Sequence, residues 1–190
     1  MVRRTTVCAV LISGCCALAL AAPVPKGAGA NAVYFPTAVG ARWVYQRPDR
    51  ADETAEVTAV EKDGDALVVS RKGADGTATV YAKMIVSADG LRQERELTDG
   101  KVGWVLKAGL KPGDSWEVPD GGTRTVHGPE LLEVPAGTFT CLRVVWKRAD
   151  GTLTSWYAPG VGEVKRVEKP DGENERVLRT LKSFKLREEK

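Results

Sequence analysis

Short apolar runs, many alternating with polar residues, follow one another from residue 33 to the end of the chain. Clear examples cover 66–70, 77–86, 143–147 and 153–157. Alternation with a period of two is the pattern of a half-buried β-strand, and clusters of Gly, Pro and Asp separate the runs. This pattern predicts a single all-β domain, an antiparallel meander of about ten strands curled into a barrel or half-barrel.

The turns between these runs have a strong local signal. Asp-Gly occurs seven times, and the pair favours a tight β-hairpin turn because both residues tolerate a positive φ. The first of each pair is Asp63, Asp75, Asp89, Asp99, Asp120, Asp150 or Asp171. Seven such pairs, most of them flanked by β-type runs, predict an antiparallel meander rather than isolated turns.

The alternation also predicts which side chains face the interior. Leu142, Val144 and Trp146 share one face of a strand, and we expect them on the inner face of the curved sheet. Trp146 is then either a core residue or part of a pocket wall that binds an apolar ligand. A second strand places Val80, Ala82, Met84 and Val86 on one face, opposite Tyr81 and Lys83.

Two segments depart from simple alternation. Residues 91–97 are mostly charged between their apolar ends, which predicts an edge or exposed strand. In the segment 177–186, Val177, Leu181 and Phe184 fit a helix face, whereas Leu178, Phe184 and Leu186 fit the parity of a strand. We predict a strand, because β-type segments surround it.

The first 21 residues have the pattern of a secretory signal. Arg3 and Arg4 precede an apolar run over 7–20, and small residues follow, so we expect cleavage between Ala21 and Ala22. The run is shorter than the roughly 20 residues of a transmembrane helix. As an alternative, residues 12–15 resemble a lipobox, which would make Cys15 a lipidated N-terminus and the protein a membrane-anchored lipoprotein.

With this signal, the sequence predicts a chain of three parts. Residues 1–21 are the signal peptide, 22–32 a flexible tether rich in Pro, Gly and Ala, and 33–190 the all-β domain. The expected location is periplasmic or extracellular. Of the four cysteines only Cys141 lies after the signal, so the mature monomer has no disulfide.

Charge excludes two classes of partner. The net charge is only +3, and basic and acidic residues are interspersed. The sequence therefore has neither the basic stripe of a nucleic-acid-binding protein nor a polybasic membrane patch.

Residues that could carry chemistry are few. His127 is the only histidine, and the sequence has no metal-ligand spacing, nucleophile elbow, P-loop or dinucleotide-binding glycine pattern. The segment beginning at Asp171 resembles a calcium loop but has Arg176 and Lys182 where that loop needs Gly and Glu. Cys141 lies in an apolar strand, which favours a buried, unreactive thiol. We therefore predict no catalytic residue, no metal and no cofactor.

Five tryptophans, at positions 43, 104, 116, 146 and 156, lie in or beside predicted strands. Exposed aromatic residues form binding platforms, but tryptophans among β-branched neighbours more often belong to a core, to which they contribute a large buried area. We expect mainly core positions, with an exposed subset as the alternative.

Three longer motifs carry a resemblance to a known family. Residues 34–45 read YFPTAVGARWVY, residues 134–144 read VPAGTFTCLRV, and residues 156–164 read WYAPGVGEV. Together they resemble the TapB-like family, a group of bacterial envelope proteins. The resemblance implies an antiparallel sheet curled into a barrel or half-barrel, like the lipoprotein carriers of the periplasm. It implies no catalytic residues.

From these observations we expect a non-enzymatic exported protein that binds an apolar ligand or a protein partner on a curved sheet. The alternative is a structural or assembly module of the cell envelope without a small-molecule site. The least favoured hypothesis is an enzyme that uses carboxylates alone.

Overall fold

The computed structural model describes residues 33–61, 66–72, 76–94, 102–119 and 121–186. The expected signal, tether and cleavage site between Ala21 and Ala22, and the alternative lipidation site at Cys15, lie outside these residues. The described chain forms twelve strands, which are β1 Arg42–Gln46, β2 Glu53–Val60, β3 Ala66–Lys72, β4 Ala78–Ser87, β5 Gly90–Glu94, β6 Val102–Lys107, β7 Ser115–Glu117, β8 Thr123–Val134, β9 Gly137–Arg148, β10 Gly151–Ala158, β11 Gly162–Pro170 and β12 Arg176–Lys185.

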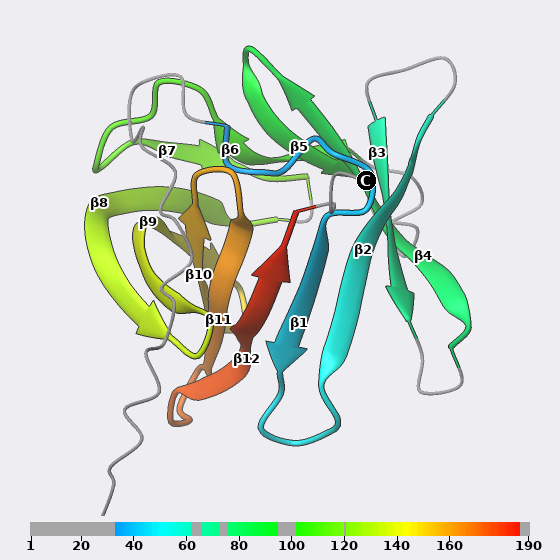
Figure 1. Ribbon diagram of the computed structural model, residues 1–190. Coiled ribbons are helices and arrows are strands. Elements are labelled where there is room, and N and C mark those ends of the chain that lie inside the picture. The colour runs from blue at the N-terminus through cyan, green and yellow to red at the C-terminus, as the bar shows by residue number, and fades with distance from the viewer. Residues whose placement is uncertain (1–32, 62–65, 73–75, 95–101, 120, 187–190) are drawn as a thin grey trace, which may run out of the picture.

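All twelve strands belong to one antiparallel sheet, which confirms the predicted all-β meander. The order is β6-β5-β4-β3-β2-β1-β12-β11-β10-β9-β8-β7, so two six-stranded meanders join where the first strand pairs with the last. Figure 1 shows this junction at the centre, with β2 to β4 on one side and β8 to β11 on the other. Strands that follow one another in sequence are therefore paired in the sheet, except β6 and β7, which lie at its two opposite edges.

The sheet curls but does not close into a barrel, so the barrel alternative is wrong. No backbone ladder joins β6 to β7. Side chains bridge the two edges instead, because the carbonyl of Trp104 on β6 accepts hydrogen bonds from Trp116 Nε1 at 3.3 Å and Arg124 Nη1 at 2.7 Å. The opening between β6 and β7 is therefore bridged by side chains rather than by paired strands.

The Asp-Gly turns at Asp89 and Asp150 join consecutive strands as predicted, but each turn lies one residue earlier than expected. The turn residues are Ala-Asp, and Gly90 and Gly151 open the next strand with φ of 129° and 133°. A Cβ at either glycine would lie 2.3 Å from a backbone oxygen of the neighbouring strand. Glycine is therefore required by close approach of the strands. The pairs at 63, 75, 99 and 120 are not fully within the described residues.

Two expectations about individual strands need correction. The segment after Gly90 is not an edge, because β5 pairs with both β4 and β6 and buries Leu91 to 3% exposure. The C-terminal segment is a strand, β12, as predicted, but its buried side chains are Arg179 and Leu181, whereas Leu186 is exposed. The pairing of β12 with β1 is irregular, and this shifts the alternation of inward and outward side chains away from the one expected.

The core lies inside the curled sheet, where hydrogen bonds from β1 reach past β12 to the start of β11. Trp43 Nε1 donates to the Val161 carbonyl at 2.7 Å, and Tyr45 Oη donates to the Glu163 carbonyl at 2.8 Å. The segment before β1 covers one end of this interior, where the ring of Phe35 packs against Trp43 with centroids 5.3 Å apart. Among the described residues we find no helix with the length and apolar character needed to cross a membrane.

Candidate functional site

A large groove lies where the β4–β5 turn meets the end of β6 and the loop that follows it. Its volume is about 720 Å³, and Leu142 on β9 and the segment at Val33 and Tyr34 complete its wall. The deeper wall is apolar, since Leu91 and Leu106 are buried there. The lining also includes two lysines, Lys107 and Lys111.

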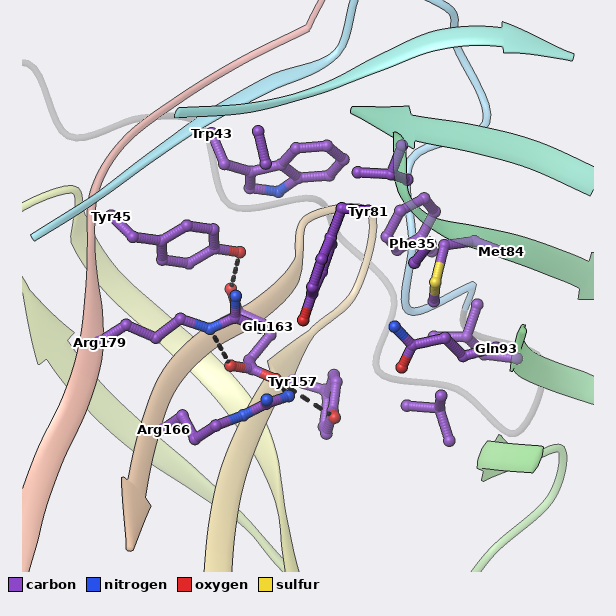
Figure 2. A pocket seen from close by; sticks show the side chains of 15 residues that line it. Phe35, Trp43, Tyr45, Tyr81, Met84, Gln93, Tyr157, Glu163, Arg166 and Arg179 are labelled. Atoms are coloured by element: carbon purple, nitrogen blue, oxygen red, sulfur yellow. Dashed lines mark hydrogen bonds and ion pairs between the residues drawn. The ribbon is translucent and has the colours of Figure 1, made fainter. Parts of the chain in front are cut away.

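A second, much smaller cavity of about 60 Å³ lies inside the curl (Figure 2). One wall is apolar and includes Phe35, Trp43 and Met84, while the opposite wall carries Glu163 and Arg179 together with other polar side chains. Leu91 lines both this cavity and the groove. The side chain of Leu91 therefore stands between the two spaces.

The polar wall is a buried ion cluster centred on Glu163. Arg179 Nε donates to Glu163 Oε1 at 2.6 Å, and Arg166 Nη2 pairs with Glu163 Oε2. The carboxylate of Glu53 extends the cluster, with Arg47 Nη1 at 2.7 Å and Arg179 Nη1 at 3.5 Å. The guanidinium of Arg179 also lies over the ring of Tyr45, 4.7 Å from its centroid.

These contacts fix the charge state of the cluster. Burial on its own would raise the pKa of Glu163, but the charges and hydrogen bonds of Arg166 and Arg179 outweigh it and lower that pKa from 4.5 to about 2. Burial would lower the pKa of Arg179, but Glu163 and other neighbours raise it well above its ordinary value. Glu163 is thus an ionised, paired carboxylate, which is unsuited to donating a proton as a general acid at neutral pH.

Irregularities in the strands bring several of these side chains to the cavity. Tyr81 lies between two residues of β4 that pair with consecutive residues of β3, so it is the extra residue of a bulge. It lines the cavity (Figure 2) instead of lying on the opposite face from Ala82 and Met84, as the alternation predicted. A similar shift in the pairing of β11 at Val164 lets both Glu163 and Arg166 reach the cavity.

The three residues of the predicted binding face divide between different spaces. Val144 and Trp146 are 3% and 9% exposed and line a third hollow of only about 10 Å³. Leu142, on the same strand, lines the large groove instead. Their roles in binding remain predictions. The sequence reasoning did not identify Glu163, Arg166 and Arg179.

Cys141 is fully buried, as predicted, with an exposed fraction of 0%. Burial and, secondarily, the carboxylate of Glu130 raise the pKa of its thiol from 9.0 to about 12. We expect Cys141 in the native mature protein to resist a disulfide reagent for many minutes and to react fully in denaturant, because little thiolate forms and access is blocked. Absorbance of the released thiol measures this, and stoichiometric labelling of native protein within seconds would contradict it.

The remaining candidates from the sequence do not come together. His127 on β8 lies at a register irregularity opposite Arg143 and is half-buried. Within the described residues no group of three or more His, Cys, Asp or Glu side chains has the geometry of a metal site. The segment at Asp171 is the loop between β11 and β12, and the residues from 171 to 177 are exposed.

Comparisons with known proteins find the same fold in two solved bacterial structures. No protein-family profile matches the chain, and no curated protein matches it. A Bacteroides fragilis protein with a YmcC-like fold, assigned as exported, aligns with a TM-score of 0.59 and 15% identity, over 81% of this chain and 99% of its own. A Parabacteroides distasonis protein, assigned as a lipoprotein, aligns with a TM-score of 0.55 and 16% identity over the same shares.

Identities this low establish a shared fold and no shared activity. The fold is therefore one that proteins assigned as exported or lipid-anchored also adopt, which agrees with the coarser part of the family resemblance. Neither match names the TapB-like family.

Proposed function

We propose that this chain is a non-enzymatic exported protein that holds one apolar molecule in the groove beside β6. The groove carries the proposal, because its volume of about 720 Å³ falls within the range of about 300–1,000 Å³ typical of small-molecule sites. Its buried wall at Leu91 and Leu106 would remove an apolar chain from water, which is the main source of affinity for such ligands.

Two further observations support this proposal over the other hypotheses. The fold is shared with proteins assigned as exported or as a lipoprotein, which agrees with the signal expected in residues 1–21. The carboxylate in the inner cavity, Glu163, is held ionised by two arginines, and this disfavours an enzyme based on carboxylates at that place. The groove is the feature that favours a small-molecule site over a structural or assembly module without one.

The test uses a neutral apolar dye whose fluorescence rises in an apolar site, N-phenyl-1-naphthylamine. We expect saturable binding to the mature protein. Ala108 is exposed at the groove wall, so Ala108→Trp should fill part of the space and weaken binding about tenfold, equivalent to about 1.4 kcal/mol.

Ala149→Trp provides the matched control, because Ala149 is exposed in the β9–β10 turn and does not line the groove. This variant should bind the dye like the wild type. Absence of saturable binding to the wild type, or equal binding by Ala108→Trp, would overturn the proposal.

A further inference from the structure

The groove has an uneven charge distribution. Lys107 ends β6 and Lys111 lies in the loop that follows, and both are exposed at the groove wall. None of the described residues that line the groove is acidic, so none balances these two charges. Two ammonium groups therefore stand beside an apolar space that is open to water.

Two aspartates lie near these lysines, and among the described contacts neither pairs with a lysine side chain. Asp114 accepts a hydrogen bond from the backbone N–H of Lys111 at 2.8 Å, and Asp89 contributes its backbone carbonyl to Ala108 at 2.7 Å. Neither aspartate lines the groove. In the part of the chain that the structure describes, no ion pair uses the side chain of Lys107 or Lys111.

The apolar part of the groove begins directly beside the lysines. Leu106 and Leu110 flank Lys107 and Lys111 in sequence and line the same space, and Leu142 faces it from β9. A ligand could thus place a hydrocarbon chain against the leucines and a charged group at the lysines without burying that charge. Keeping the charge at the water boundary avoids the large cost of desolvating it.

We infer that the ligand class of the groove is a free single-chain amphiphile with a carboxylate head, of the fatty-acid type. This inference rests on the proposed function and adds the chemistry of the head group. Contact with the leucines supplies most of the affinity, whereas the exposed lysines select the sign of the head group, since exposed ion pairs contribute modestly. A membrane surface is the less favoured partner, because it would need a larger basic cluster than two lysines.

The experiment compares three ligands with the same twelve-carbon chain for displacement of the neutral dye. We expect dodecanoate to displace it at about tenfold lower concentration than dodecanol, and dodecyltrimethylammonium to be weaker than both. The double variant Lys107→Gln with Lys111→Gln should lose this preference for dodecanoate while binding dodecanol as before. Raising the salt concentration should reduce the preference in the wild type.

The control is Lys147→Gln with Lys169→Gln, which removes the same charge from two exposed lysines that do not line the groove. It should keep the preference for dodecanoate. Equal displacement by all three ligands would refute the carboxylate head while leaving the apolar site intact. Failure of the dye itself to bind would instead overturn the proposed function.

A final arm distinguishes a free ligand from a membrane. We expect no co-sedimentation of the mature protein, freed of any acyl chain, with vesicles that contain phosphatidylglycerol. Co-sedimentation that is abolished in the Lys107 and Lys111 double variant, without selective displacement by dodecanoate, would overturn the inference in favour of a membrane surface.

Discussion

Glu163→Gln is expected to lower the free energy of unfolding by about 3–5 kcal/mol, because it removes the counter-charge shared by buried Arg179 and largely covered Arg166. The side chains of Glu163, Arg166 and Arg179 are 6%, 15% and 9% exposed. After the substitution, water cannot easily replace the lost carboxylate. Such a loss is a large part of the 5–15 kcal/mol that a domain usually has. Reversible urea unfolding measures it.

The pH dependence of stability should identify the same group. The folded-state pKa of Glu163 is lowered to about 2 from 4.5, so its contribution is complete above pH 4.5 and is lost as the pH falls toward 2. The wild type should therefore lose stability across this window more steeply than Glu163→Gln.

A second glutamate on the same strand provides the control. Glu168 pairs with Arg148 and with Arg176, whose side chain is 62% exposed. Because Arg176 is open to water and stays hydrated without its partner, Glu168→Gln should cost less than Glu163→Gln, about 1 kcal/mol. If Glu163→Gln costs no more than Glu168→Gln, the inner cluster does not have the structural role we assign to it.

Trp146→Ala is expected to cost about 3–5 kcal/mol, the range for removing a large buried aromatic side chain. Trp146 is 9% exposed, and its Nε1 donates to the Gly121 carbonyl at 2.9 Å. The guanidinium groups of Arg124 and Arg148 lie 5.0 and 5.5 Å from its ring centroid. The substitution therefore removes packing, a hydrogen bond and two cation–π contacts.

If Trp146 instead lines the ligand site, the same variant shows it, because the two roles predict different results. The hollow beside it measures only about 10 Å³, which favours a core position. Affinity for the neutral dye should then be unchanged. Weaker dye binding with little loss of stability would show that Trp146 lines the ligand site. Trp156→Ala, which removes a half-buried tryptophan on the next strand, should destabilise less.

The parts of the fold that could be predicted depend on local signals. The Asp-Gly sequences mark the β4–β5 and β9–β10 turns, and alternation identifies Val144 and Trp146 as neighbours on one buried face of β9. Both signals depend only on residues a few positions apart. Whether the sheet closes cannot be predicted from such local signals, because closure depends on how β6 and β7 meet after the whole chain has folded.

The polar cavity could not be predicted for a related reason. Period-two alternation assigns faces only while a strand is regular, and bulges at Tyr81 and Val164 change the parity at the positions that matter. A charged residue among apolar neighbours, such as Glu163 between Gly162 and Val164, was the available signal. It was weak because charged residues interrupt most strands of this chain.

The pairing of the first strand with the last sets the order in which the fold can be completed. Because β12 is the last strand of the chain, β1 has an unpaired edge until nearly the whole domain is available to fold. Unpaired edges are sites of intermolecular strand association. The chain therefore depends on its last ten-residue strand, Arg176–Lys185, both to complete the sheet and to cover its earliest exposed edge.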